Sequence, residues 1–190
     1  MCGLSGYYSL VDNSSNLDLS LDAIRHRGPD SSGSQLFGFG GSFKIGLGHN
    51  RLSILDLSRN GQQPMISSDG KIAMVFNGEI YNHADLRTQI VGHSFRSSSD
   101  SEVLLEYYRQ YGISGFAHLR GMFAVAFYEI DTGNLILLRD QIGVKPLYYY
   151  KLNDDLVFSS EISSIIKLTN ISKIDSFALK QYKTLRTFFN

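Results

Sequence analysis

The sequence has only one cysteine among its 190 residues, so it cannot form an internal disulfide. Its N-terminus also lacks the basic stretch and the apolar stretch of a secretory signal. A chain without disulfides or a secretion signal is typical of a reducing compartment. We therefore expect a cytoplasmic location.

The sequence has no excess of charge of either sign, because 18 Lys and Arg residues balance 18 Asp and Glu residues. No dense cluster of Lys or Arg is present, so electrostatic binding to nucleic acid or to an anionic membrane has no support. No apolar run approaches the ~20 residues that a membrane-spanning helix needs. We therefore expect neither nucleic acid nor a membrane as a partner.

Metal and nucleotide motifs are absent as well. The five histidines show no paired spacing, and neither of the common glycine-rich phosphate-binding patterns occurs. We therefore expect no metal and no cofactor in this segment. The length suits one domain with a proper hydrophobic core.

The lone cysteine, Cys2, directly follows the initiator Met1. Methionine aminopeptidases remove Met1 readily before a small side chain, and removal would leave a thiol and a free α-amine on one residue. A thiol ordinarily titrates near ~8.5 and an α-amine near ~7.7–8.0, so the neutral amine can accept the thiol proton. A lone cysteine is more often a small buried apolar residue. Position 2, with glycines at positions 3 and 6, favours a nucleophile that the fold holds in place.

Apolar periodicity predicts a chain of mixed secondary structure. Two stretches, 71–76 and 121–130, are apolar on both faces, which indicates a sheet that is covered on both sides. Further strands are expected at residues 3–10, 43–54, 135–138, 147–151 and 156–159. Helices are expected at residues 17–24, 81–90, 161–168, after residue 99 and from residue 175.

Arginines are the candidate anion-binding residues. Residues 25–33 (RHRGPDSSG) predict a surface loop, whose two arginines fit solvated side chains better than an anion site. Arg51 ends a strand in which glycines fill alternate positions, and glycine weakens a strand unless something must approach the backbone. Arg51 is therefore either an edge-strand charge or a bidentate partner for a substrate carboxylate.

The pair Asn77-Gly78 follows a predicted strand. Alone it would predict a tight hairpin, but the helical spacing after residue 81 favours a strand-to-helix junction. There, a side-chain amide and an unobstructed N–H supply the two donors of an oxyanion hole. Asp100 follows the predicted capping residue Ser99 and is explained by the helix macrodipole, so spacing alone assigns it no binding role.

Seven motifs in order resemble the N-terminal glutaminase domain of glutamine-hydrolysing asparagine synthetases, a class II glutamine amidotransferase domain. They lie at residues 1–6, 25–30, 49–56, 77–82, 99–102, 119–124 and 145–149. The resemblance implies an α+β fold, the four-layer αββα sandwich of N-terminal-nucleophile (Ntn) hydrolases, with two mostly antiparallel sheets between helices. This fold suits the doubly apolar strands and the amphipathic helices.

The resemblance also implies the chemistry. Cys2, freed of Met1, attacks the side-chain amide of L-glutamine, and its own α-amine acts as the base. The oxyanion is stabilised by the Asn77 side chain and by the N–H of Gly78. Ammonia leaves first, and water then releases glutamate from the thioester.

The charged ends of glutamine receive partners from the same resemblance. Arg51 binds the α-carboxylate, and Asp100 with Glu79 binds the α-ammonium group. The remaining predicted pocket residues contribute backbone groups, and they are Leu52, Ser53, Ile54 and Leu55.

The resemblance implies an enzyme of two domains. Residues 2–168 would form the glutaminase domain, and residues 169–190 would begin the connection to a C-terminal synthetase domain that this sequence does not contain. That domain would use ammonia in an ATP-dependent amidation of aspartate to asparagine, and ATP and Mg²⁺ are expected only there. Two alternatives stay open: amidation of another carboxylate, such as a sugar acid in polysaccharide biosynthesis, or a non-catalytic docking or regulatory module. The sequence also leaves open whether two copies pair as a homodimer.

Overall fold

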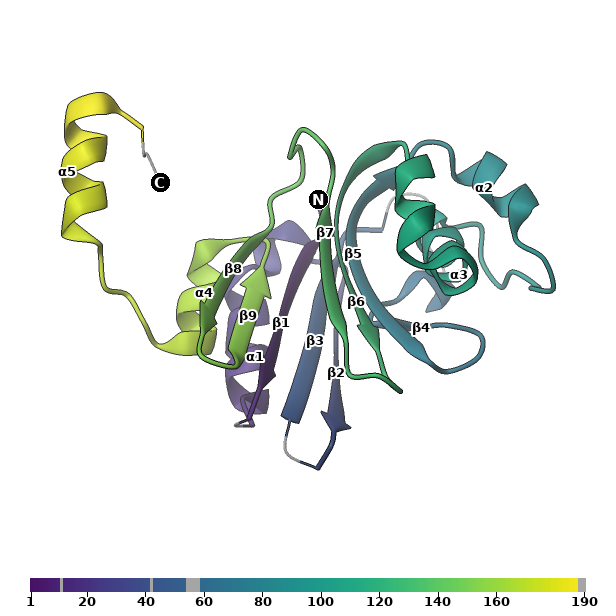
Figure 1. Ribbon diagram of the computed structural model, residues 1–190, viewed down its shortest axis with the longest axis horizontal. Coiled ribbons are helices and arrows are strands. Elements are labelled where there is room, and N and C mark those ends of the chain that lie inside the picture. The colour runs from purple at the N-terminus through teal and green to yellow at the C-terminus, as the bar shows by residue number, and fades with distance from the viewer. Residues whose placement is uncertain (11, 42, 54–58, 188–190) are drawn as a thin grey trace.

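The computed structural model describes residues 1–10, 12–41, 43–53 and 59–187, in which two antiparallel sheets lie face to face between helices (Figure 1). The first sheet has the order β2-β3-β1-β9-β8 and the second the order β4-β5-β6-β7. The strands of the first sheet are β1 (Gly3–Ser9), β2 (Ser31–Phe39), β3 (Phe43–Arg51), β8 (Tyr148–Leu152) and β9 (Asp155–Ser159). Those of the second are β4 (Met65–Ile66), β5 (Ile72–Ile80), β6 (Gly121–Glu129) and β7 (Leu135–Arg139).

Helices cover both outer faces of the pair of sheets. The helices α1 (Ser14–Ala23) and α4 (Ile162–Thr169) pack on the first sheet, and α2 (His83–Gln89) and α3 (Asp100–Tyr111) lie on the outer side of the second (Figure 1). The last helix, α5 (Ser176–Leu185), has no buried residue and is set apart from the sheets (Figure 1). Short 3₁₀ helices lie at Arg25–Arg27, Arg59–Gly61 and Gly112–His118. The predicted αββα sandwich with two antiparallel sheets is confirmed.

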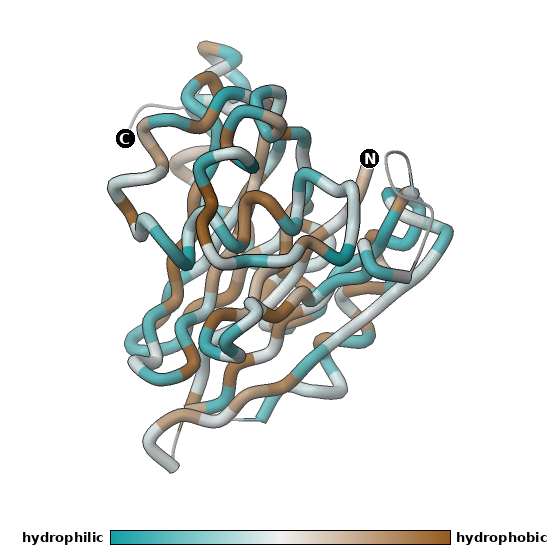
Figure 2. The backbone as a smooth tube through the Cα atoms, turned by 90° about the vertical axis from the view of Figure 1, so that its right-hand side faces the viewer, coloured by the Kyte–Doolittle hydropathy of each residue, from teal (hydrophilic) through white to brown (hydrophobic). Residues whose placement is uncertain are grey.

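The hydrophobic core has three layers because side chains alternate along each strand. In β5, Ala73 and Val75 face the first sheet and pack with Leu4 of β1, whereas Met74 and Phe76 face α3. A third layer lies between the first sheet and the helices α1 and α4. Hydrophobic residues recur along the strands, and hydrophilic residues dominate many of the loops (Figure 2).

Three local expectations need correction. The stretch 25–33 is not one loop, because its first three residues form a 3₁₀ helix and its last three belong to β2. Asn77 and Gly78 lie inside β5, which continues to Ile80, and α2 begins only at His83. The glycines of β3 make room for the core: an added Cβ would lie 2.3 Å from the Tyr7 ring at Gly46 and 2.9 Å from Leu21 at Gly48.

The start of α3 also differs from the expected reciprocal capping box. The Ser99 side chain accepts the N–H of Glu102, as predicted. The Glu102 carboxylate does not return to Ser99; it accepts hydrogen bonds from the N–H groups of Arg96 and Ser97 and contacts His93. The helix end is therefore tied to the preceding loop, which brings Ser99 and Asp100 to the second sheet.

Candidate functional site

A pocket lies where the layer between the two sheets reaches the end of the strands. The alternation that places Leu47 of β3 between the sheets also places His49 and Arg51 on that face. In β5 the same alternation runs from Val75 through Asn77. The site is thus an extension of the inter-sheet core in which polar residues replace apolar ones.

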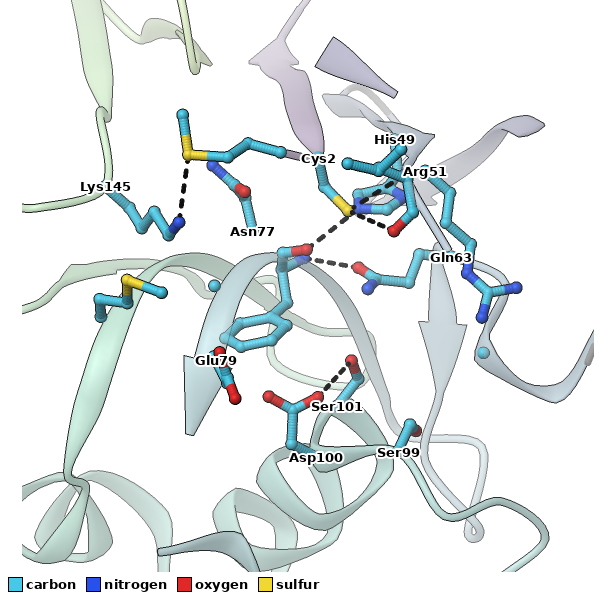
Figure 3. A pocket seen from close by; sticks show the side chains of 16 residues that line it. Cys2, His49, Arg51, Gln63, Asn77, Glu79, Ser99, Asp100, Ser101 and Lys145 are labelled. Atoms are coloured by element: carbon cyan, nitrogen blue, oxygen red, sulfur yellow. Dashed lines mark hydrogen bonds between the residues drawn. The ribbon is translucent and has the colours of Figure 1, made fainter. Parts of the chain in front are cut away.

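The pocket has a volume of about 120 Å³ and brings together most of the residues that the sequence had singled out (Figure 3). The predicted residues that line it are Cys2, Arg51, Leu52, Asn77, Gly78, Glu79 and Asp100. Ser53 does not line it, and Ile54 and Leu55 lie outside the described residues.

Both the side chain and the main-chain carbonyl of Cys2 are held by contacts at the pocket. The Leu52 N–H donates to the Cys2 sulfur at 3.4 Å, and the Leu52 carbonyl lies 3.6 Å from it. The Cys2 carbonyl accepts a hydrogen bond from Nε of Arg27 at 3.1 Å. Met1 precedes it, and the Met1 sulfur contacts Nζ of Lys145 at 3.2 Å.

The two arginines of residues 25–27 have different surroundings. Arg25 is exposed and pairs with Asp22 of α1, as the solvated interpretation predicts. Arg27 is largely buried, and its Nη1 lies 3.1 Å from Oε1 of Glu161 while its Nε bonds to Cys2. Arg27 therefore holds the backbone of Cys2 and is not a solvated side chain.

Asn77 carries a buried hydrogen-bond donor that faces the pocket. Its side chain is 1% exposed, and among the described residues its Nδ2 has no hydrogen-bond partner. A buried polar group without a partner costs about 1–3 kcal/mol, so such groups usually serve a ligand or a reaction. The amide is therefore placed to donate to an acceptor that enters the pocket.

The cationic side of the pocket is formed by Arg51. This residue ends β3 and is 9% exposed. Gly61 makes room for its guanidinium, because an added Cβ there would lie 2.3 Å from Nη2 of Arg51. In the view of Figure 3, Arg51 and Lys145 lie on opposite sides of Cys2.

The acidic side of the pocket is formed by Asp100 and Glu79. Asp100 stands in the first turn of α3, is 4% exposed, and accepts the N–H of Ile80 at 2.9 Å. Burial raises the pKa of Asp100 above its ordinary value, the Ile80 hydrogen bond opposes this, and the negative charge of Glu79 adds to it. Two carboxylates that repel each other in one pocket favour a cationic ligand group.

Several lining residues were not predicted as site residues: Met1, His49, Gly61, Gln63, Phe76, Ser99, Ser101, Met122 and Lys145. A signal for His49 existed, because it shares a strand face with Arg51. Gln63 and Lys145 carry no such signal, since their places depend on how distant segments meet. Lys145 is only 6% exposed, and its N–H donates to Oδ2 of Asp140 at 3.0 Å.

Neither a metal cluster nor a membrane span is found in the part of the chain that the structure describes. No group of three or more His, Cys, Asp or Glu side chains that could hold a metal is present in these ranges. No helix in them is long and apolar enough to cross a membrane.

Comparison with known proteins places this chain in a family. The model of the glutamine amidotransferase domain matches residues 1–189. The chain is 39% identical over 171 residues to asparagine synthetase [glutamine-hydrolyzing] 2 of Bacillus subtilis, and 38% identical over 194 residues to asparagine synthetase [glutamine-hydrolyzing] 1 of the same organism. These matches cover 87% and 98% of this chain but only 22% and 30% of the relatives.

A solved structure supports the fold independently of sequence. Glutamine phosphoribosylpyrophosphate amidotransferase from B. subtilis, complexed with ADP and GMP, matches with a TM-score of 0.71 at 20% identity. The match covers 88% of this chain and 43% of that one. Fold, family model and curated relatives agree, and the chain belongs to the glutamine amidotransferase domain family.

Proposed function

We propose that this chain is the glutaminase domain of an asparagine-synthetase-type amidotransferase and hydrolyses L-glutamine to glutamate and ammonia. One observation carries the proposal: the only cysteine and a buried amide donor without a partner line the same pocket. The flanking charges match the two ends of an amino acid. Arg51 suits the α-carboxylate, and the carboxylates of Glu79 and Asp100 suit the α-ammonium group.

The reaction would begin after Met1 is removed. The Cys2 thiol transfers its proton to its own α-amine, and the sulfur attacks the side-chain carbonyl carbon of glutamine. Asn77 Nδ2 and the Gly78 N–H donate to the oxyanion, where one such donor is worth about 3–4 kcal/mol in measured hydrolases. The C–N bond then breaks, the α-ammonium returns its proton to the leaving nitrogen, and ammonia departs.

Hydrolysis of the thioester completes the cycle. Water attacks the same carbonyl carbon with the α-amine as base, and the oxyanion again faces Asn77 and Gly78. The C–S bond breaks, the thiol is restored and glutamate is released. Backbone groups of Leu52 would line the pocket around the substrate, and a site that pairs both charged ends rejects analogues that lack one.

The fate of the ammonia depends on a further domain. Because the chain spans less than a third of the two Bacillus relatives, we propose that residues 2–168 are the glutaminase domain and that 169–190 lead toward a synthetase domain. The names of these relatives favour aspartate as the acceptor. We propose that the amidation is ATP-dependent and that ATP and Mg²⁺ act only in that further domain. The cytoplasmic location and the absence of a cofactor from this domain are parts of the same proposal.

Steady-state assay of glutamate release tests the proposal. The parent protein should hydrolyse glutamine, and Cys2→Ala should lower the rate to background while the protein stays folded. Asp22→Asn, at an exposed ion pair remote from the pocket, is the matched control and should retain the parent rate. A Cys2→Ala variant with the parent rate would refute the mechanism, and an inactive parent without Met1 would favour the non-catalytic module.

A further inference from the structure

Two buried side chains hold the two peptide groups that flank Phe76, the residue before Asn77. The Phe76 N–H donates to Oε1 of Gln63 at 2.6 Å, and the Phe76 carbonyl lies 3.0 Å from Nε2 of His49 (Figure 3). His49 is 1% exposed and Gln63 is 8% exposed, and both line the pocket. The proposed chemistry uses neither of them.

Gln63 stands where a strand partner would be. The pairing of β4 with β5 ends at Met65 opposite Met74, and its continuation would place Gln63 opposite Phe76. The side chain of Gln63 accepts the Phe76 N–H there. Its main chain lies against the first sheet, because an added Cβ on Gly33 of β2 would be 2.4 Å from the Gln63 carbonyl oxygen.

His49 links the strand of the nucleophile to the strand of the oxyanion donor. In β3 it is paired with Leu4 of β1, two residues after Cys2. Its imidazole crosses between the sheets to Phe76 of β5, the residue before Asn77. A single side chain therefore connects the two halves of the site, which belong to different sheets.

The protonation state of His49 allows it to donate a hydrogen bond to the Phe76 carbonyl near neutral pH. Burial lowers the pKa of His49 to about 4, the Phe76 carbonyl opposes this shift, and the positive charge of Arg51 adds to it. The imidazole is therefore neutral near pH 7. Since the carbonyl can only accept, Nε2 carries the hydrogen and donates it.

We propose that His49 and Gln63 are positioning residues that set the separation between the Cys2 sulfur and the donors at Asn77 and Gly78. Apolar contact between the sheets is non-directional, whereas these two hydrogen bonds fix the peptide planes on either side of Phe76, the second of which leads into Asn77. Oxyanion donors must lie about 2.7–3.1 Å from the oxygen, and a displacement of about 1 Å costs on the order of a hundredfold in rate. The inference rests on the proposed glutaminase function.

Substitution at His49 tests the positioning role. His49→Met has a similar volume but no donor, and we expect it to lower kcat for glutamine hydrolysis about 10- to 100-fold with KM changed less than about threefold. His49→Gln offers an amide N–H in place of Nε2 and should recover most of the loss. Tyr108→Phe, which removes a buried hydrogen bond to Glu129, is the control for lost stability and should keep kcat.

Substitution of Gln63 provides a second test in case His49→Met does not fold. Gln63→Met removes the acceptor of the Phe76 N–H and should also lower kcat about 10-fold or more. Alkylation of Cys2 by iodoacetamide needs no oxyanion hole, so its rate should stay within about twofold of the parent in both variants. A fall in alkylation equal to the fall in kcat would mean general disruption and would refute the role.

A double-mutant cycle gives the sharpest test. If His49 acts through the donors at Asn77 and Gly78, His49→Met should lower kcat by a smaller factor in an Asn77→Ala background, where only Gly78 remains, than in the parent. Effects that multiply fully would overturn the inference. Absence of hydrolysis in the parent protein would refute the proposed function and the inference with it, whereas hydrolysis unaffected by His49→Met and Gln63→Met would refute the inference alone.

Discussion

Truncation of Asn77 and truncation of Asn50 should have opposite effects on activity and stability, although both residues are buried asparagines in adjacent parts of the fold. Each is 1% exposed. Asn50 Nδ2 donates to the Leu21 carbonyl at 2.7 Å, whereas Asn77 Nδ2 has no partner among the described residues. If Asn77 is kept for a ligand, its truncation should harm catalysis and spare stability, and truncation of Asn50 should do the reverse.

The magnitudes follow from the hydrogen bonds that each change removes. Asn77→Ala should lower kcat about 10²- to 10³-fold, the usual cost of one oxyanion donor. It breaks no hydrogen bond of the amide nitrogen and removes the cost of a buried donor without a partner, so the free energy of unfolding should not fall. Asn50→Ala removes one of two hydrogen bonds that the Leu21 carbonyl accepts, the other coming from the Ile24 N–H, and should cost about 0.5–1.5 kcal/mol, or about 2–4 °C in Tm per kcal/mol.

Glutamate release and thermal unfolding, measured on both variants, check this pair of expectations. Asn50→Ala should keep kcat within about twofold of the parent at a temperature where it is folded. Two results would refute the reasoning: an Asn77→Ala variant with kcat within threefold of the parent, or one that loses as much stability as Asn50→Ala.

Three further expectations concern charge. Arg51→Met should raise KM for glutamine at least about tenfold with a smaller effect on kcat, in steady-state assays; an unchanged KM would contradict a carboxylate partner. Because burial raises the pKa of Asp100, the ionised Asp100 side chain destabilises the folded protein at pH values above the ordinary pKa of Asp. Asp100→Asn should therefore raise both Tm at pH 7 and KM, and the gain in Tm should vanish as the pH falls below about 4; a lower Tm at pH 7 would argue against it. Glu102 is the opposite case: burial raises its pKa, but hydrogen bonds from Ser97 and Arg96 outweigh this and leave the pKa below its ordinary value. The ionised Glu102 side chain contributes its full stabilisation at pH values above the ordinary pKa of Glu, and this contribution is lost as the pH falls through the lowered pKa of Glu102. Glu102→Gln should therefore lower Tm at pH 7 and flatten the acid limb of a Tm–pH curve.

Much of the fold follows from local pattern. Continuous apolar runs predicted β5 and β6, because strands covered on both faces leave no polar side. The same patterns could not predict β2, which is an edge strand of small and polar residues with most positions exposed. It pairs with β3 along its whole length, from Ser31 opposite Arg51 to Phe39 opposite Phe43.

The sequence predicts those site residues that stand in a short, recognisable motif. Cys2, Arg51 and Asn77 each stand in a distinctive local pattern, whereas the role of Asp100 came only from the family resemblance. The structure gathers all four in one pocket. Gln63, which approaches both sheets, had no such pattern. The place of Gln63 beside Phe76 depends on where β4 ends and on how closely that segment approaches β2.

The most direct test of the account is an intact mass spectrum after exposure to 6-diazo-5-oxo-L-norleucine, an electrophilic analogue of glutamine. We expect a chain without Met1 that carries one covalent adduct, with the adduct suppressed by excess glutamine and absent from Cys2→Ala. That result would establish a Cys2 nucleophile in a glutamine-binding pocket. A chain that has lost Met1 and forms no adduct, or an adduct that persists in Cys2→Ala, would contradict the central claim.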